Sequence, residues 1–351
     1  MPEPRLTGMA QTVLGPIPAD ELGITLPHEH LLMDFTGLFE EPEDPAEQRM
    51  AHSPISLLNR DWIRRHYTSN LDNLKYEDED IAVAEALLFK QAGGNTIVDA
   101  SDWDLGRHPQ ALFRIAQRTG LNIIMGTGHY EAPFHPGGMD FRKETDIAQA
   151  MVGDIQDGVG DTRICSGIIG EIGCSWPWTD GEKKSVRAAV IAQQMTGAAL
   201  MLHPGRHPEA PPEIVKTLLD LGADIERTIM AHIDRTIFDF EAMVRLAESG
   251  CCLEFDMFGE ETSYYPQNPG IDLPNDPMRI DIIKRLVNAG FLKQILISQD
   301  ISFKIQLVHY GGYGFAHILK HVVPAMRRKG MTDEQINTIL VANPRRLLSF
   351  P

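Results

Sequence analysis

The stretch GITLPHEHLLMDF, residues 23–35, decides the fold, because a short apolar run leads directly into a segment that carries two histidines. An apolar run of this length predicts a strand over 23–28. A doubly wound sheet that binds a nucleotide usually follows its first strand with a glycine-rich loop, and PHEHLLMDF is not such a loop. The stretch therefore favours a different parallel α/β architecture.

Seven further apolar, β-branched runs repeat this pattern along the chain: TIVDAS (96–101), NIIMGTG (122–128), ICSGIIGE (164–171), AALMLHP (198–204), RTIMAH (227–232), CCLEFD (251–256) and ILISQD (295–300). Helical periodicity lies between the runs, over 80–92, 109–119, 185–196, 212–221, 238–249 and 278–289, and two closing helices are expected over 313–329 and 332–349. Near-continuously apolar strands suit a parallel sheet that is covered on both faces. Eight βα units predict an α/β fold, the closed (β/α)8 TIM barrel.

Two connections are longer than ordinary βα loops. Residues 36–78 follow the first strand, and residues 257–277 follow the seventh. Both are expected at the carboxyl-terminal face of the strands, where barrel enzymes build their active sites. Since no repeat, low-complexity tract or linker stands out, we predict a single domain over 1–351 that carries both segments as insertions.

The charge of the chain limits its partners. It holds 49 acidic and 32 basic residues, a formal charge of −17, which argues against nucleic acid and favours a small-molecule substrate. The sequence has neither an apolar run near the ~20 residues that span a bilayer nor a secretory layout at its start, so we expect no membrane association and a cytoplasmic location. Four cysteines without CxxC spacing are expected to be reduced core thiols: Cys165, Cys174, Cys251 and Cys252.

Metal-binding side chains stand at the predicted strand ends. His28 and His30 are two residues apart, so on a strand both point to the same side and can share an ion. The fourth, fifth, sixth and eighth runs end in the same kinds of side chain: Glu171, His203, His232 and Asp300. Imidazole and carboxylate suit Zn²⁺ and neighbouring divalent ions, and six such groups are more than one tetrahedral ion uses. We therefore predict a binuclear centre with Glu171 as the candidate bridge.

Such a centre predicts hydrolysis. A water molecule that bridges two ions roughly 3.5–4 Å apart loses a proton near neutral pH and becomes a nucleophile. Asp300, a carboxylate on the metal side opposite the bridge, is expected to take that proton and pass it to the leaving group.

Seven motifs follow one another over nearly the whole chain: QTVLG (11–15), LPHEHL (26–31), GIIGEIGCSWP (167–177), LHPGR (202–206), AHIDRTI (231–237), LEFDMFG (253–259) and YGGYGFAHIL (310–319). Together they resemble the phosphotriesterase family of the amidohydrolase superfamily, and most closely its phosphotriesterase-related proteins. The resemblance implies one set of ligands for a buried metal (His28, His30 and Asp300), a second set for a more exposed metal (His203 and His232), and Glu171 as the bridge. Many relatives carry a carboxylated lysine at the bridge, and none is expected here. The implied cofactor is two divalent ions per chain, Zn first, with Mn, Co or Fe as alternatives.

Further residues are expected around this centre. Tyr130 is similar to the tyrosine that points at the bridging hydroxide in lactonase-type relatives, although a packing role is the alternative. Arg206 and Arg235 lie just beyond ligand-bearing strand ends and are expected to bind an anionic part of the substrate, with a salt bridge to a loop carboxylate as the alternative. We name Asp300, Tyr130 and Arg235 as catalytic candidates.

Three rim residues, His129, Trp103 and Trp176, are expected to line the pocket, although such aromatic residues are as often structural. Met257 stands where lactonase-type relatives often have arginine, so a substrate held by that arginine is less expected.

The predicted function is a hydrolase whose metal-bridging hydroxide attacks a small carboxylic ester or lactone. The first alternative is an amidase for N-acyl amino acids or amino sulfonates, followed by a phosphotriesterase. From another class, a non-catalytic protein that binds metal and a small ligand is the rival. The resemblance also implies pairing as a homodimer.

Overall fold

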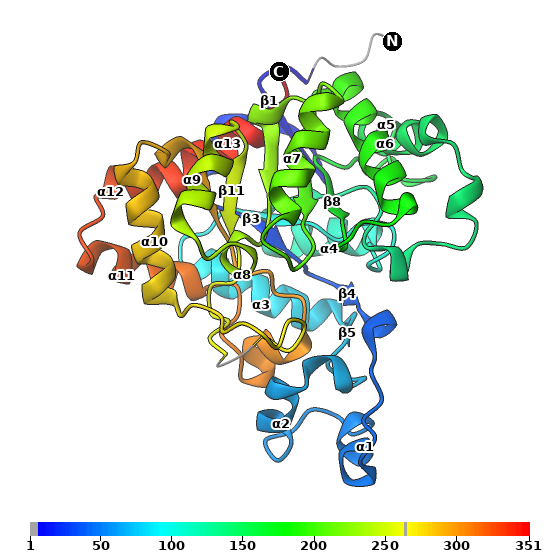
Figure 1. Ribbon diagram of the computed structural model, residues 1–351, viewed down its shortest axis with the longest axis vertical. Helices are drawn as coiled ribbons and strands as arrows, with labels where there is room; N and C mark the ends of the chain where they lie inside the picture. Colours follow the sequence, from blue (N-terminus) through cyan, green and yellow to red (C-terminus); the bar gives the residue numbers. More distant parts are fainter. Residues whose placement is uncertain (1–5, 263–264) are drawn as a thin grey trace.

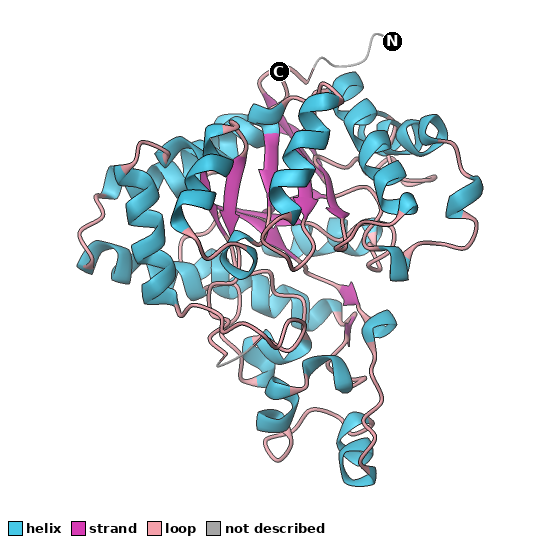
Figure 2. Cartoon of the chain, in the orientation of Figure 1, coloured by secondary structure: helices cyan, strands magenta, loops and turns pink. Residues whose placement is uncertain are grey.

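A computed structural model describes residues 6–262 and 265–351, and parallel strands lie among the helices of the barrel domain, as Figure 2 shows in magenta. The strands of the barrel ring are β3 (Thr25–Glu29), β6 (Thr96–Asp99), β7 (Asn122–Met125), β8 (Ile169–Gly173), β9 (Leu200–His203), β10 (Thr228–Met230), β11 (Cys252–Phe255) and β12 (Ile295–Ile297). Each lies at a predicted run. The main difference is β8, which begins five residues later than predicted and continues past Glu171.

The ring closes through hydrogen bonds between two ladders. One ladder has the order β12-β11-β10-β9-β8, and the other has the order β3-β6-β7. His28 N donates to Ser298 Oγ at 3.1 Å, which joins β3 to the end of β12. At the other seam, Gly167 N donates to Met125 O at 2.9 Å, which joins β7 to the segment before β8. The predicted (β/α)8 barrel is confirmed.

Helices surround this ring on the outside (Figure 1). They are α3 (Glu79–Gln91), α4 (Pro109–Thr119), α5 (Glu144–Gln156), α6 (Asp180–Thr196), α7 (Ala210–Asp220), α8 (Ile233–Thr236), α9 (Phe240–Glu248), α10 (Asp276–Asn288), α11 (Val323–Arg328), α12 (Asp333–Asn337) and α13 (Asn343–Leu348). Single π-helical turns, Ile318–Val322 and Thr338–Ala342, lead into α11 and α13. The sequence pattern does not predict α5, because Gly153 interrupts its apolar periodicity.

Local sequence signals explain where helices begin and end. In α6, Thr179 and Glu182 form a reciprocal capping box at the first turn, and the helix ends at Gly197 with φ 73°. In α4, Pro109 occupies the first turn, where its missing N–H costs nothing, and Gly120 ends the helix at φ 63°.

Alternate strand residues separate the barrel interior from the outer layer. An inner cluster contains Val98, Ile124, Met201, Ile229, Cys252 and Leu296. The residues next to them pack with the helices in the outer cluster: Ile97, Ile123, Leu200, Met230, Leu253 and Ile295. The amino-terminal half of the barrel interior is therefore an apolar plug, and polar side chains gather at the carboxyl ends.

The two ends of the barrel differ (Figure 1). The hairpin of β1 (Met9–Thr12) and β2 (Gly15–Pro18) lies at the amino end, where Phe350 N donates to Met9 O at 2.9 Å and ties the two ends of the chain together. At the carboxyl end, residues 36–78 project with α1 (Pro45–Ala51) and α2 (Arg60–Arg65). The short pair β4 (Met33–Asp34) and β5 (Lys75–Tyr76) connects this projection to the barrel.

The second predicted insertion, 257–277, also lies at this end, and its residues 263 and 264 are outside the described residues. Among the described helices, none combines the length and apolarity that crossing a membrane requires. The four cysteines are free thiols, and all but the partly exposed Cys165 are buried.

Candidate metal centre and active site

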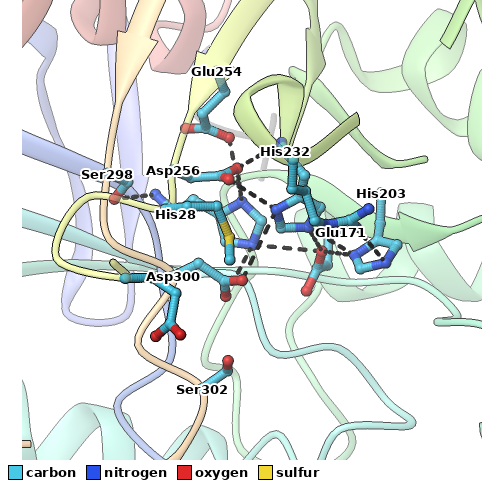
Figure 3. Close-up of polar contacts among 12 residues, drawn as sticks. His28, Glu171, His203, His232, Glu254, Asp256, Ser298, Asp300 and Ser302 are labelled. Carbon is cyan, nitrogen blue, oxygen red and sulfur yellow. Dashed lines mark hydrogen bonds and ion pairs between the residues drawn. The ribbon is translucent and has the colours of Figure 1, made fainter. Parts of the chain in front are cut away.

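The six predicted metal ligands converge at the carboxyl ends of the strands. Figure 3 shows His28, Glu171, His203, His232 and Asp300 in this cluster. They come from β3 and the residue after it (His28 and His30), from within β8 (Glu171), from the end of β9 (His203), and from just beyond β10 and β12 (His232 and Asp300). The histidines and Glu171 are buried, and the Asp300 side chain is 16% exposed. The fold therefore brings all six together, and their roles as ligands stay a prediction.

Glu171 is the centre of this cluster. Its Oε2 lies 2.8 Å from His203 Nδ1, 3.3 Å from His232 Nε2 and 3.4 Å from His28 Nε2. Its other oxygen, Oε1, lies 3.5 Å from His30 Nε2. Burial alone would raise the pKa of Glu171, but the imidazoles of His28 and His203 hold it well below its usual value. The carboxylate is therefore ionised and contacts both predicted groups of ligands.

Asp300 faces the same histidines from the other side. Its Oδ1 lies 3.2 Å from His30 Nε2 and 3.8 Å from His28 Nε2. Ligand atoms that are each about 2.0–2.1 Å from one tetrahedral ion are about 3.3 Å apart, so these separations suit a shared ion. Asp300 and His232 have φ of 45° and 56°, in the left-handed region that non-glycine residues rarely adopt. Backbone strain of this kind tends to cluster at functional sites.

Buried acceptors orient the ligand imidazoles. Asp256 Oδ1 lies 2.8 Å from His232 Nδ1, and Asp256 Oδ2 accepts a bond from His232 N at 2.9 Å and lies 3.2 Å from His28 Nδ1. Glu254 Oε2 lies 3.3 Å from His28 Nδ1, and Ser101 Oγ lies 2.9 Å from His30 Nδ1. Carboxylates only accept, so Nδ1 of His28 and of His232 donates to them, and Nε2 of each ring faces Glu171 as the atom that would bind an ion.

The sequence analysis missed these orienting residues, although a signal was present. Cys252 belongs to the inner apolar cluster, and Glu254 and Asp256 follow it at the same parity along the strand direction. Two acids on the inner side of a predicted strand end could therefore have been assigned to the site. Burial would raise the pKa of Asp256, but His232 and His28 hold it far below its usual value, whereas burial raises the pKa of Glu254 to about 7.

The geometry fits a metal centre. Nε2 of His28 and Nε2 of His30 are buried and have no hydrogen-bond partner among the described residues, which is costly for a polar atom unless an ion binds there. These atoms, the Glu171 and Asp300 carboxylates, and the nitrogens of His203 and His232 form overlapping groups whose ligand atoms lie within 4.8 Å of one another. Imidazole nitrogen with carboxylate oxygen is the donor set that Zn²⁺ and related divalent ions use.

A cavity opens over this cluster at the carboxyl ends of the strands. The predicted ligands Glu171, His203 and Asp300 line this cavity. Its other lining residues are Phe35, Tyr67, Tyr130, Arg206, Arg235, Met257, Glu260, Tyr265, Gln267, Ser302, Phe303 and Gln306. Of the predicted substrate-binding residues, Arg206, Arg235 and Met257 thus reach the cavity.

The two arginines differ in their partners. Arg206 Nη1 forms an ion pair with Glu131 Oε1 at 3.2 Å, and Arg206 Nη2 donates to Gln267 Oε1 at 3.0 Å. The alternative considered for Arg206, a salt bridge to a loop carboxylate, therefore occurs. Arg235 Nη2 donates to Pro204 O at 3.2 Å and lies 3.0 Å from His203 Nε2. No carboxylate of the described residues lies within 4 Å of Arg235, although its side chain is buried.

Tyr130 lines the cavity beside the ligands. Its hydroxyl oxygen lies 3.2 Å from His203 Nδ1, and burial raises its pKa well above the usual value, so the phenol stays protonated. The Tyr130 ring also packs against the Phe35 ring, with the two ring centroids 5.9 Å apart.

The other three predicted pocket residues lie outside the lining of this cavity. Trp103 Nε1 donates to Asp154 Oδ2 at 2.7 Å, and His129 Nδ1 lies 3.0 Å from Asp104 Oδ2. Trp176 stacks on His207 with a centroid separation of 4.8 Å. A structural role therefore fits all three side chains better than contact with the substrate, because hydrogen-bonded or stacked partners hold them in the loops.

Comparisons with known proteins agree with this geometry. The model of the phosphotriesterase family matches residues 8–348. A phosphotriesterase-related protein of Nematostella vectensis is 43% identical over 347 residues, which cover 98% of this chain and 99% of the relative. An N-acetyltaurine hydrolase of Dictyostelium discoideum is 40% identical over 363 residues, which cover 98% of each protein. The crystal structure of a resiniferatoxin-binding protein from Rhodobacter sphaeroides has a TM-score of 0.94 and 37% identity, and covers 97% of this chain and 95% of that one. The chain therefore belongs to the phosphotriesterase family, and it is a metal-dependent hydrolase.

Proposed function

We propose that this protein is an amidase that removes a short acyl group from an amine bearing an acid group, with N-acyl amino sulfonates such as N-acetyltaurine as the substrates to test first. The sequence placed this activity second, after ester or lactone hydrolysis. Two facts favour it now. One is the similarity to proteins named N-acetyltaurine hydrolase over nearly the full chain, and the other is the state of Arg235.

The observation that carries the proposal is a buried guanidinium that forms no ion pair with any described residue. Arg235 is 2% exposed, lines the cavity next to His203, and has no carboxylate within 4 Å among the described residues. Burying an unpaired charge is expensive, and a sulfonate or carboxylate of the substrate would offset that cost. The planar guanidinium can offer two parallel N–H donors to such a group. Arg206 already has Glu131, so Arg235 is the better candidate for this contact.

The reaction requires activation of water and a proton for the leaving amine. Two divalent ions held by the predicted ligands would supply the first, by lowering the pKa of a bound water molecule and polarising the acyl carbonyl. Asp300 borders both the cavity and His30, so it is the carboxylate placed to hold a proton and deliver it to the amine nitrogen. Tyr130, whose phenol is protonated, can donate to the acyl oxygen from beside His203.

An aromatic wall lies on another part of the cavity and suits the acyl end. Phe303 packs against Phe35 at 5.6 Å and against Tyr67 at 4.6 Å between ring centroids, and all three residues line the cavity. An apolar wall of rigid rings binds a short alkyl group and resists a long one. We therefore expect acetyl to be preferred over longer acyl groups.

The test compares two amides that differ only in the acid group. N-acetyltaurine is expected to have a kcat/KM at least about tenfold above that of N-ethylacetamide, in line with one charge-assisted contact. Arg235→Met should remove this advantage and leave the rate for N-ethylacetamide nearly unchanged. Arg245→Met, on the exposed face of α9, is the matched control. Equal rates for both amides in the wild-type protein would overturn the proposal.

Hydrolysis of a small carboxylic ester or lactone is the second candidate. Met257 favours it in one respect, because it brings a neutral side chain to the cavity wall, which suits an uncharged carbonyl substrate. The same residue counts against substrates that need an arginine at this position. Rates for acetate esters and simple lactones, measured beside the amides, rank the two candidates directly.

The other expectations from the sequence remain proposals. We propose Zn as the first of the candidate ions, Glu171 as their bridge, and the single-domain organisation over 1–351. A homodimer and a cytoplasmic location also stay predictions. A phosphotriester substrate ranks third.

A further inference from the structure

Glu260 is a cavity residue that the proposed chemistry has not used. It follows β11 and lines the cavity together with Arg235 and Asp300. Its backbone is held on both sides, because Glu260 N donates to Met257 O at 3.0 Å and Arg279 Nη2 donates to Glu260 O at 2.9 Å. Glu260 and Gln306 also line a neighbouring hollow, so they form the wall between the two spaces.

The carboxylate of Glu260 is oriented but only partly satisfied. Gln306 Oε1 accepts bonds from Ser302 N and Phe303 N, both at 2.8 Å, which fixes the orientation of this side-chain amide. Gln306 Nε2 therefore points to Glu260 and donates to its Oε2 at 3.4 Å. Among the residues that the structure describes, nothing donates to Glu260 Oε1, and no lysine, arginine or histidine nitrogen lies within 4 Å of the carboxylate. One acceptor oxygen is left for a ligand.

A negative side chain in a cavity for an anionic substrate repels that substrate unless it recognises a donor. An N-acyl amino sulfonate has one hydrogen-bond donor, the amide N–H, beside the bond that breaks. In the corresponding ester an oxygen replaces this N–H, and a carboxylate would repel its lone pairs. After cleavage of the amide, the nitrogen leaves as an ammonium group, which a carboxylate also attracts.

We infer that Glu260 makes the active site select amides over esters, by accepting the substrate's amide N–H and then contacting the ammonium group of the product. This inference rests on the proposed amidase function and assigns its specificity to one side chain. Glu260 acts by recognising the leaving group, whereas Asp300 is the residue that moves the proton.

The test uses two substrates of matching shape, N-acetyltaurine and 2-acetoxyethanesulfonate, in which an ester oxygen replaces the amide N–H. In Glu260→Gln, the amide-to-ester ratio of kcat/KM is expected to fall about 10–100-fold, the usual effect of losing a charged hydrogen-bond partner. The ester rate should stay the same or rise. Glu261→Gln is the matched control, because the neighbouring carboxylate accepts a bond from Asp276 N at 2.9 Å and is not on the active-site cavity.

Each outcome has a separate meaning. An unchanged ratio in both Glu260→Gln and Glu260→Ala overturns the inference, and so does an equal loss of both activities, because a structural role lowers both together. A wild-type protein that fails on the amide, with or without activity on the ester, instead overturns the proposed amidase function. The wild-type rates thus test the function, and the variant ratio tests Glu260.

Discussion

Replacement of Asp256 by asparagine is expected to weaken metal binding by about 10–100-fold, although Asp256 is not itself a predicted ligand. Both of its oxygens accept: Oδ1 lies 2.8 Å from His232 Nδ1, and Oδ2 takes the bond from His232 N and lies 3.2 Å from His28 Nδ1. An asparagine has only one acceptor oxygen, so its NH₂ group must face an N–H donor. Either His232 or His28 then loses the bond that fixes its ring and tautomer.

The magnitude follows from these contacts. A 10–100-fold loss of affinity corresponds to about 1.4–2.8 kcal/mol of binding free energy. The metal-free protein should also lose about 1–3 kcal/mol of unfolding free energy, since a buried donor is left without an acceptor. Glu254→Gln is the control, because among the described residues the Glu254 carboxylate pairs only with His28 Nδ1, at 3.3 Å, and its change should cost less.

The assay is competition for Zn²⁺ with a chelator of known affinity, combined with elemental analysis of the purified protein. Urea unfolding of the metal-free variants measures the stability term separately. An Asp256→Asn protein that keeps the wild-type metal content and affinity would refute the reasoning. So would a larger loss of affinity in Glu254→Gln than in Asp256→Asn.

Three further predictions concern the bridge, the barrel and the loops. Elemental analysis of the wild type should find near two divalent ions per chain, and Glu171→Ala should lower this number to one or none. A metal content of one ion per chain in both proteins would show that Glu171 is not the bridge. Gly126→Ala should destabilise the protein by about 1–3 kcal/mol in urea unfolding and reduce its metal content, because the added Cβ would lie 2.2 Å from Gly170 O, next to the bridge; wild-type stability would contradict this. Burial would raise the pKa of Asp276, but His317, at 2.6 Å, and a backbone N–H hold it below the usual value. Its stabilisation is therefore present above about pH 4 and is lost progressively as the pH falls through the lowered pKa of Asp276. Asp276→Asn should cost about 1–2 kcal/mol at pH 7 and less at each lower pH, and a pH-independent difference in unfolding free energy would argue against this contact.

The barrel could be predicted because its signal is repeated and local. Each strand is a short apolar run whose two faces are both buried, and the helix predicted over 109–119 ends at Gly120, as the structure confirms. The strand after 164 shows the limit of this approach. The apolar run begins at Ile164, but the regular pairing with β9 begins only at Ile169. The segment before Ile169 forms a hydrogen bond to β7 instead.

The metal-binding candidates could be predicted for a related reason. Parallel strands in a closed ring bring their carboxyl ends together, so reactive side chains at those ends become neighbours whatever their separation in sequence. The pocket wall follows no such rule. Trp103 and His129 are as close to strand ends as Tyr130 is, yet only Tyr130 lines the cavity, since Asp154 and Asp104 hold the other two in the loops.

For the same reason, the sequence could not show whether Arg206 or Arg235 is the better candidate to bind an anionic group of the substrate. Each follows a ligand-bearing strand end, and each had a salt bridge or an anionic substrate as its expected partner. The difference lies in Glu131, which the loop after β7 brings to Arg206, while no described carboxylate reaches Arg235. Charge pairing across loops depends on three-dimensional contacts rather than on spacing along the chain. Under the proposed function, substrate specificity depends on Arg235 and Glu260, which form no ion pair within 4 Å with any residue that the structure describes.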